Sequence, residues 1–597
     1  MRARLTIAAI LSIAFISALT PAWGQTTLTW SGGGATDWNT AANWTPHQVP
    51  TALDHVIINS GTVVVPATGA FNIMDWFGGD LAGAINVTTG HVLNIGGNVE
   101  LDAALTNSGT MNWTNGSINM AYNVNTAGPI INQSGATWNI SCDNYWSTES
   151  GAGYPFYANA YIVNLGLMRK TAGTGTTQIG FGNSYAVQFR NLGTVEADSG
   201  TINFEGGGFI SGTYTAAASA TVLFGHGSYT VTNANTSATG TIEFTGDNLT
   251  LTSDLIPNLK LLGGNVVLGS GFQGGSITNL TIAGSTLLGS YTLAGVMNWT
   301  AGFINGALTV SSSGTLNING SVFYLDAALT NSGTVNWMSG GINMAYNNSS
   351  AGPIINQPGG TWNISGNNYL DTQSNPGYPS EPNAYFVNNG LLRKTAGGGT
   401  TQLGFGGAYI VQFRNYGTAE SDSGILSFEC GGLIGGSYTA NAGATINFHK
   451  GSFVAGDFFP GGAGTVEFTG DSLTLSNSLP AKLQLVSGTL ALGPTFQGGT
   501  ITNLTLAGVT LNGNYTVGGI LNWNTGDIIG SLLVATNGVL NINGDIFWDA
   551  AVTNAGTVNW TAGNVNMAYN VSMAGPVVNL PGAAWNIQCD KFFGTES

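Results

Sequence analysis

The amino-acid sequence predicts an all-β protein that folds as a long right-handed parallel β-helix. Three observations predict this class. The chain has 597 residues, of which 91 are glycines, and 43% are hydrophobic while 7% are charged. Short stretches that alternate apolar and polar residues recur behind glycines, and alternation with a period of two is typical of β-strands. Long segments also return in the same order about 224 residues apart.

Composition narrows the class of protein further. Gly, Asn, Thr and Val are common, while the helix formers Lys and Glu are scarce. Disorder needs low hydrophobicity and high charge, so the composition argues against it. The net charge is −16, and only 12 Lys and Arg are present. A nucleic-acid surface needs cations that neutralise phosphates, so we expect no nucleic-acid partner.

Residues 1–24 have the features of a signal peptide. Arg2 and Arg4 supply a positive start, residues 5–19 are apolar, and small residues follow. The apolar stretch is shorter than the roughly 20 residues that a spanning helix needs. No later segment is long and apolar enough either, so we expect no transmembrane segment in the mature chain. The protein is therefore expected to be secreted or held at the cell surface.

Residues 25–62 are expected to form an N-terminal cap. This region is rich in tryptophan, and Trp30, Trp38 and Trp44 are candidates to cover the first coil. An uncovered β edge invites pairing with other chains, so a cap at this end agrees with the fold class.

A long internal repeat accounts for the rest of the chain. DAALTNSGTMNW at 102–113 returns as DAALTNSGTVNW at 326–337 and as DAAVTNAGTVNW at 549–560. A period of about 224 residues exceeds the 20 to 50 of a simple solenoid unit, so each long copy must contain smaller units. The predicted β-helix repeats are 63–249 (repeat 1), 250–473 (repeat 2) and 474–597 (repeat 3, truncated).

The third repeat stops in mid-block at FFGTES (592–597), where the earlier copies continue. The terminal repeat of a solenoid is usually atypical because it closes the core. We therefore expect the sequence to be an incomplete version of a longer chain. It would form a monomeric rod, or one that associates edge to edge at its open C-terminal end.

The smaller units are short strands. In GTVNW, Val335 and Trp337 are predicted to face one side and Asn336 the other, because side chains alternate along a strand. Such pieces return every 15 to 28 residues or so, which fits an antiparallel sandwich or propeller as well as a parallel β-helix.

Two features favour the β-helix. The same motif returns in the same orientation, without regular two-residue hairpins between opposed strands. The N-x-G motifs at Asn331, Asn388 and Asn415 would stack as a ladder that satisfies the side-chain amides. The low charge agrees, because like charges on neighbouring coils would lie about 4.8 Å apart and repel.

Two segments carry a family resemblance. FRNLGTVEADSGTINFEGGG (189–208) and FRNYGTAESDSGILSFECGG (413–432) resemble the N-x-G-T repeats of bacterial secreted adhesins, which include filamentous-haemagglutinin-like and autotransporter-passenger β-helices. The opening at 30–61 resembles the start of many bacterial surface β-helix proteins. The resemblance implies a bacterial, extracellular β-helix scaffold.

Duplicated acidic residues are the candidates for catalysis. They would act as general acid and base, or hold Ca²⁺ and abstract a proton, as in a polysaccharide lyase or glycoside hydrolase. A solvated face with arginine partners, duplicated as a block, is the simpler interpretation and the one that we favour. The candidates are Glu196, Asp198 and Glu205 with Arg190, and Glu420, Asp422 and Glu429 with Arg414.

Basic pairs accompany the acidic residues. Arg169-Lys170 returns as Arg393-Lys394, and we expect these pairs to neutralise nearby carboxylates. The histidines lack the spacing of metal ligands, so we expect no metal site and no cofactor, although the acidic balance would tolerate Ca²⁺.

Tryptophans are weak candidates for ligand binding. Trp113, Trp337 and Trp560 recur at the end of the same motif and could stack on sugar rings. The interpretation that we favour is that they fill the coil interior, since a ring of this size buries roughly 150–250 Å².

The sequence thus predicts a non-catalytic exported bacterial protein, a cell-surface adhesin or an extracellular matrix or stalk component. It would bind glycans, or host or abiotic surfaces, through repeated weak contacts. The alternative is a secreted polysaccharide lyase or glycoside hydrolase, whose mark would be one unrepeated groove lined by carboxylates. A purely structural layer protein is a third class.

Overall fold

The computed structural model describes residues 25–120, 128–148, 161–181, 187–344, 352–372, 384–404, 411–571 and 575–595. Most of these residues lie in β-strands, and no α-helix occurs among them. Short 3₁₀ segments interrupt the strands at η1 (Ala41–Asn43), η2 (Phe272–Gly275) and η3 (Phe496–Gly499). The predicted all-β class is confirmed. The predicted signal peptide lies outside the described residues.

The strands pair in parallel from coil to coil, which confirms the parallel β-helix. β1 (Thr27–Trp30) pairs in parallel with β3 (His55–Ile58). An exception is β2 (Trp44–Thr45), which runs antiparallel to β1. The Trp44 ring meets the rings of Trp30 and Trp38 edge-on, with centroids 4.9 Å apart in both pairs. These rings are buried and pack together beside the first coils.

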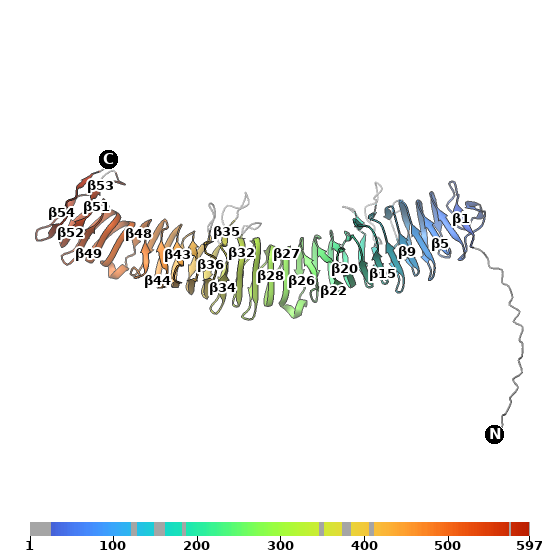
Figure 1. Cartoon of the computed structure of the whole chain (residues 1–597), viewed down its shortest axis with the longest axis horizontal. Coiled ribbons are helices and arrows are strands. Elements are labelled where there is room, and N and C mark those ends of the chain that lie inside the picture. Colours follow the sequence, from blue (N-terminus) through green and yellow to red (C-terminus); the bar gives the residue numbers. More distant parts are fainter. Residues whose placement is uncertain are drawn as a thin grey trace, which may run out of the picture. The chain divides into compact units, whose positions relative to one another are not determined.

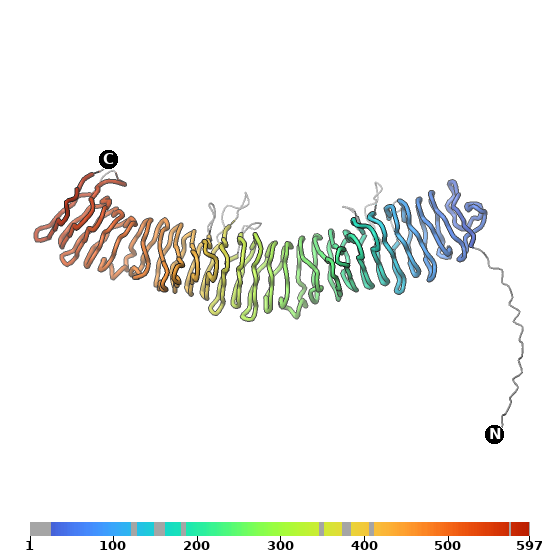
Figure 2. Tube along the Cα trace, viewed as in Figure 1, coloured from blue at the N-terminus to red at the C-terminus, as the bar shows by residue number. Residues whose placement is uncertain are grey.

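The chain forms two compact units, each a stack of parallel coils (Figure 1). The first unit contains residues 1–207 and 212–222, and the second contains 208–211 and 223–597. Within the second unit, the tube passes from one coil to the next so that segments one coil apart lie side by side (Figure 2). The predicted repeats 2 and 3 belong to this unit.

One sheet of the first unit carries most residues of interest. Its strands are stacked in register, so that each residue lies over its equivalent in the next coil. The strands are β3, β5 (Ile73–Trp76), β7 (Val92–Ile95), β9 (Thr110–Trp113), β12 (Thr137–Ile140), β15 (Leu167–Lys170) and β18 (Thr194–Ala197).

The second and fourth residues of these strands point inward, because side chains alternate along a strand. Met74, Leu93, Met111, Trp138 and Met168 are stacked in this way and are fully buried. Each such side chain stabilises the core by roughly 1.5–3 kcal/mol. The first and third residues face outward, where the polar chemistry lies.

The second unit contains the equivalent sheet twice. In repeat 2 the strands are β28 (Tyr291–Asn305), β30 (Thr315–Leu325), β32 (Thr334–Met344), β34 (Thr361–Ile364), β37 (Leu391–Lys394) and β40 (Thr418–Ser421). In repeat 3 they are β49 (Ile501–Val534), β50 (Val539–Asn543), β52 (Thr557–Ala562) and β55 (Ala584–Ile587).

Candidate functional site

A row of hydrogen-bonded polar side chains, here named the outer Asn ladder, runs along the outside of the sheet in the first unit. Asn94 Nδ2 donates to Asp75 Oδ1 at 2.8 Å, and Asn112 donates to Asn94 at 2.9 Å. Asn139 donates to Asn112 at 2.9 Å, and Arg169 donates to Asn139 at 3.3 Å. The ladder therefore begins at the Arg169 guanidinium, which can only donate hydrogen bonds, and ends at the Asp75 carboxylate, which can only accept them.

The second unit repeats this arrangement in both of its long repeats. Every donation again runs from one coil to the preceding coil, over distances of 2.8 to 3.4 Å, and each row ends on a threonine hydroxyl. The rows are Asn363, Asn336, Asn317, Asn298 and Thr281 in repeat 2, and Asn586, Asn559, Asn541, Asn522 and Thr505 in repeat 3.

The ladder amides stay partly exposed. Each asparagine carries two N–H donors and a carbonyl oxygen with two lone pairs, and the ladder uses one donor and one lone pair. Asn112 and Asn336, for example, are neither buried nor fully exposed. A second N–H and a second lone pair are therefore left for solvent or a ligand in each coil, spaced by about 4.8 Å.

A second row of amides, the inner Asn ladder, confirms the predicted stacking of the N-x-G motifs. Asn331 donates to Asn356 at 2.8 Å, Asn356 to Asn388 at 2.8 Å, and Asn388 to Asn415 at 2.7 Å. All four side chains are fully buried. The sequence analysis did not predict Asn356 as a member of this row, because residues 356–359 read NQPG and do not match the N-x-G motif.

The inner ladder is a structural element rather than a site. Its amides donate toward the following coil, opposite to the outer ladder, and each also donates to a backbone carbonyl, as Asn331 does to Thr361 at 3.1 Å. The first unit contains the same row as Asn107, Asn132, Asn164 and Asn191, and repeat 3 begins it with Asn554 and Asn579. A buried amide with such partners stabilises the stack.

The predicted acidic candidates are divided between two sheets. Glu196 on β18 lies in register with Arg169 of β15, and Arg169 Nε lies 3.9 Å from Asp198 Oδ2. Glu205 instead follows β19 (Thr201–Phe204), which pairs with β16 (Thr176–Phe181). It accepts hydrogen bonds from Gln178 of β16 at 2.9 Å and from Asn203 of β19 at 2.5 Å. The structure therefore does not bring the three carboxylates into one cluster.

Repeat 2 divides its acidic residues in the same way. Arg393 Nε lies 2.5 Å from Glu420 Oε2 and 3.8 Å from Asp422 Oδ2. Glu429 is nearly buried and accepts a hydrogen bond from Ser427 at 2.7 Å. The arginine side chains in these pairs are more than a third exposed, which is typical of a surface ion pair.

The predicted arginine partners have other neighbours. Arg190 lies over the Tyr161 ring, with 4.3 Å to the centroid, and Arg414 lies 4.6 Å from the centroid of Tyr385. Arg169 and Arg393, the first residues of the basic pairs, contact the acidic residues, in keeping with their expected neutralising role.

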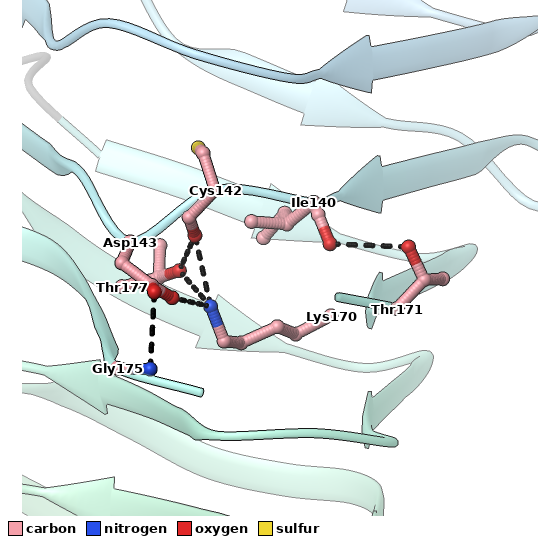
Figure 3. A network of polar contacts seen from close by, with 7 residues as sticks. All are labelled: Ile140, Cys142, Asp143, Lys170, Thr171, Gly175 and Thr177. Carbon is pink, nitrogen blue, oxygen red and sulfur yellow. Dashed lines mark hydrogen bonds and ion pairs between the residues drawn. The ribbon is translucent and has the colours of Figure 1, made fainter. Parts of the chain in front are cut away.

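The second residue of each basic pair lies inside the coil. Lys170 is fully buried and occupies the stack position held by Ile140 one coil earlier. Its ammonium donates to the Cys142 carbonyl at 2.8 Å, to Asp143 Oδ1 at 2.6 Å and to Thr177 Oγ1 at 2.9 Å (Figure 3). The strict alternation along β15 could have revealed this, since Arg and Lys are neighbours and must face opposite sides.

Repeat 2 keeps the lysine and changes its partner. Lys394 is also fully buried and donates to the Gly366 carbonyl at 2.9 Å and to Thr401 Oγ1 at 3.1 Å. Asn367 takes the place of the aspartate, at 3.4 Å. Burial lowers the pKa of Lys394 to about 8.

Two carboxylates approach each other in repeat 3. Asp527 and Asp549 are almost completely buried. The Tyr569 and Asn570 backbone N–H groups donate to Asp549 at 2.7 and 2.8 Å, and Asn570 Nδ2 donates to Asp527 at 2.9 Å. Burial raises the pKa of Asp527 to about 6, the nearby Asp549 charge adds to this, and the Asn570 hydrogen bond opposes it.

The tryptophan candidates lie in the interior. Trp113 and Trp337 are fully buried, and Trp560 is 4% exposed. Their indole N–H groups donate to the backbone carbonyls of Gly116, Gly340 and Gly563 respectively. The rings therefore present no open face to a sugar, which agrees with the favoured interpretation that they fill the coils.

One histidine lies beside a carboxylate in the first coils. His55 Nε2 lies 2.7 Å from Asp75 Oδ2 at the end of the first outer Asn ladder. Among the described residues, no group of three or more His, Cys, Asp or Glu side chains is placed to hold a metal ion.

Comparisons with protein-family models, curated proteins and solved structures gave no match for this chain. In the described part of the chain, no helix has the length and apolar character needed to cross a membrane.

Proposed function

We propose that this chain is a non-catalytic exported bacterial protein, a cell-surface adhesin or an extracellular matrix or stalk component, which binds glycans or surfaces through repeated weak contacts. The outer Asn ladder, present in each of the three long repeats, is the observation that carries this proposal. It supplies a regular row of amides whose remaining donors and acceptors face outward.

The ladder suits a ligand that is itself repetitive. Its amides are already oriented by their neighbours in the stack, so little side-chain freedom is lost on binding. A single amide contact with a hydroxyl in water contributes about 1 kcal/mol or less. Many contacts along one extended ligand would add to a useful affinity, since later contacts form at high effective concentration.

Binding of the full chain to a glycan array and to insoluble polysaccharides tests the proposal. We expect the double variant Asn317→Ala with Asn336→Ala to bind several-fold more weakly, because two consecutive amides of one ladder are lost. Thr474→Ala, an outward change on β46 (Ser472–Leu475), is the matched control and should bind normally. Failure of the wild-type chain to bind any glycan or surface would exclude the proposal.

A polysaccharide lyase or glycoside hydrolase is the second candidate, and one observation favours it. Asp371 of β35 (Tyr369–Thr372) is an unrepeated carboxylate, because Ser147 holds the equivalent register in repeat 1. Burial raises the pKa of Asp371 to about 6, which suits a general acid at neutral pH. Burial, followed by the charges of Glu429 and Asp371, raises the pKa of Cys430 to about 11, so both carboxylates lie near this thiol.

An activity assay on acidic and neutral polysaccharides separates the two candidates. Turnover that disappears in Asp371→Asn and persists in Glu420→Gln would establish the enzyme. The proposed binding function predicts no turnover by the wild-type chain.

A further inference from the structure

The sheet that carries the outer Asn ladder is interrupted at the same place in both long repeats of the second unit. β25 (Leu259–Leu261) pairs with β23 (Thr241–Phe244) on one side. The next coil on its other side is β27 (Ile277–Leu288), and the two strands, both fully described, share no hydrogen-bonded register. β47 (Leu483–Leu485) stands in the same relation to β49.

Each interruption opens into a cavity. The first has a volume of about 390 Å³ and is lined by residues from both strands, among them Leu259, Lys260, Asn279 and Thr281. The second has a volume of about 560 Å³ and is lined by the equivalent Leu483, Gln484, Asn503 and Thr505. We name these cavities the first and second junction grooves, because they lie where one long repeat meets the next.

The grooves are closed at one end by backbone contact. A Cβ on Gly284 would lie 2.2 Å from the Leu262 carbonyl oxygen, and one on Gly508 would lie 2.3 Å from that of Val486. The coils therefore touch beside each groove, and an additional β-strand, which needs about 4.8 Å on either side, does not fit between them. The grooves can accept the edge of a ligand but not an inserted peptide strand.

The polar side of each groove is held in place by a strained loop. Gln273 adopts a positive φ of 46°, and its side chain bonds the backbone N–H and carbonyl of Asn279 at 3.0 and 2.9 Å. Gln497, with φ 48°, binds Asn503 in the same way. A non-glycine residue with a positive φ is strained. Both repeats therefore keep a conformation that costs folding stability, and its glutamine holds the backbone of this asparagine in place.

Charge differs between the two grooves while the neutral groups are kept. Lys260 lies 3.7 Å from Glu243 in the first groove. In the second groove, Gln484 holds the position equivalent to Lys260. It lies in register with Glu467, so this carboxylate has no lysine at that position. The shared lining is an amide, a hydroxyl and the partly exposed leucines Leu255 and Leu479. These groups suit the hydroxyls and the C–H faces of a sugar and do not depend on a ligand charge.

The outer Asn ladder ends at these grooves. Asn298 donates to Thr281 Oγ1, and Asn522 donates to Thr505 Oγ1, each at 3.4 Å. Each threonine can still donate its own hydroxyl hydrogen outward. The groove and the ladder therefore form one continuous polar track in each repeat.

We infer that each junction groove binds the edge of a neutral polysaccharide chain, with sugar hydroxyls on the asparagine and threonine and sugar C–H groups on the partly exposed Leu255 or Leu479. This inference rests on the proposed glycan-binding function and gives that function a defined position. A chain anchored in the groove would continue along the adjoining outer Asn ladder.

Titration calorimetry of the full chain with cellohexaose, maltohexaose and hexagalacturonate tests the inference. We expect at least one neutral hexasaccharide to bind, and the double variant Asn279→Ala with Asn503→Ala to weaken its binding at least tenfold. Thr281→Val with Thr505→Val should act in the same direction and provides a second, conservative change. Thr474→Ala is the control, and circular dichroism checks that the variants fold.

The charge variants distinguish the ligand class. Lys260→Gln and Gln484→Lys should leave neutral binding unchanged, because the shared lining does not depend on charge. Preference for hexagalacturonate, or a tenfold loss in Lys260→Gln alone, would overturn the neutral class. If polysaccharides bind but both groove double variants bind as the wild type does, the groove is wrong and the proposed function stands. If no saccharide binds in any assay, the glycan-binding function fails, and this inference fails with it.

Discussion

Lys170 and Lys394 occupy the same interior position in two long repeats, but they differ in the charge of a neighbouring side chain. Lys170 has Asp143 at 2.6 Å, whereas Lys394 has the neutral Asn367 at 3.4 Å. Burial alone would raise the pKa of Asp143, but the hydrogen bond from Lys170, that from the Gly175 N–H, and the lysine charge hold it below its ordinary value. Repeat 2 has no such compensation, and the pKa of Lys394 falls to about 8.

The difference shows what a solenoid tolerates inside its stack. In each repeat the lysine holds a position that an isoleucine occupies one coil earlier. Its ammonium donates to backbone and hydroxyl oxygens, and these hydrogen bonds hold the neighbouring loop against the sheet. Breaking a buried pair by removing one partner is costly, while replacing both partners with apolar groups often is not. The two repeats therefore provide a comparison in which the lysine is kept while its carboxylate partner is replaced by a neutral amide.

The largest expected effect is the loss of the counter-ion. Asp143→Ala should lower the local free energy of unfolding around β15 by about 3 kcal/mol, the lower end for a broken buried pair because Asp143 is 38% exposed. Native-state hydrogen exchange of the β12 and β15 amides measures this. The double variant Lys170→Met with Asp143→Ala should recover most of the loss, and no recovery would mean that the ammonium is already well solvated.

The reverse substitution in repeat 2 should be stabilising. Asn367→Asp supplies the missing counter-ion, and we expect a gain of about 1–2 kcal/mol at neutral pH. In the wild type, the folded chain holds the Lys394 proton only to about pH 8, and the unfolded chain holds it to 10.5. The unfolded state binds more protons between these values, so stability should rise with pH across that window.

Urea unfolding of the second unit between pH 7 and 10.5 measures this pH dependence. Asn367→Asp should remove the rise, because the lysine then stays charged in the folded state. A flat profile in the wild type would show that Lys394 keeps its ordinary pKa.

The carboxylate pair in repeat 3 extends the comparison to buried acids. Phe303 of repeat 2 stands where repeat 3 has Asp527. The folded chain should keep the Asp527 proton to about pH 6, while the unfolded chain releases it near 3.8. The folded state binds more protons in this window, so its stability should fall as pH rises from about 4 to about 6.

Asp527→Asn should remove that fall and stabilise repeat 3 at pH 7 by about 1–2 kcal/mol, since a neutral amide then replaces the buried carboxylate. Thermal unfolding at pH 4.5 and 7 provides the measurement, with Phe303→Leu in repeat 2 as a control that should not alter the pH dependence. An unchanged fall in Asp527→Asn would assign the titration to another group.

Much of this architecture could be predicted from the sequence, for physical reasons. Alternation in GTVNW identified which face Val335 and Trp337 occupy, and N-x-G motifs identified the inner Asn ladder, because both depend on local periodicity. The partners of Arg169 and Arg190 could not be assigned, because they depend on which residues coil stacking brings into register. The junction grooves exist because β25 does not pair with β27, nor β47 with β49. The alternation of residues within a single strand cannot reveal whether that strand pairs with the next coil.

The smallest effect should come from the surface ion pairs, which complete the contrast with Lys170. Glu420 is 22% exposed and Arg393 38%, and Arg393 also lies 3.8 Å from Asp422. Glu420→Gln should therefore change the free energy of unfolding by less than about 1 kcal/mol, because solvent screens the pair and a second carboxylate remains. Urea unfolding at low and high salt measures the change, and Asp198→Asn in the first unit, whose carboxylate lies 3.9 Å from Arg169, should cost even less.

A loss of several kcal/mol in Glu420→Gln would show that the acidic cluster is a structural centre of the coil. A small loss would leave the interior lysines as the ionic groups on which coil stability depends.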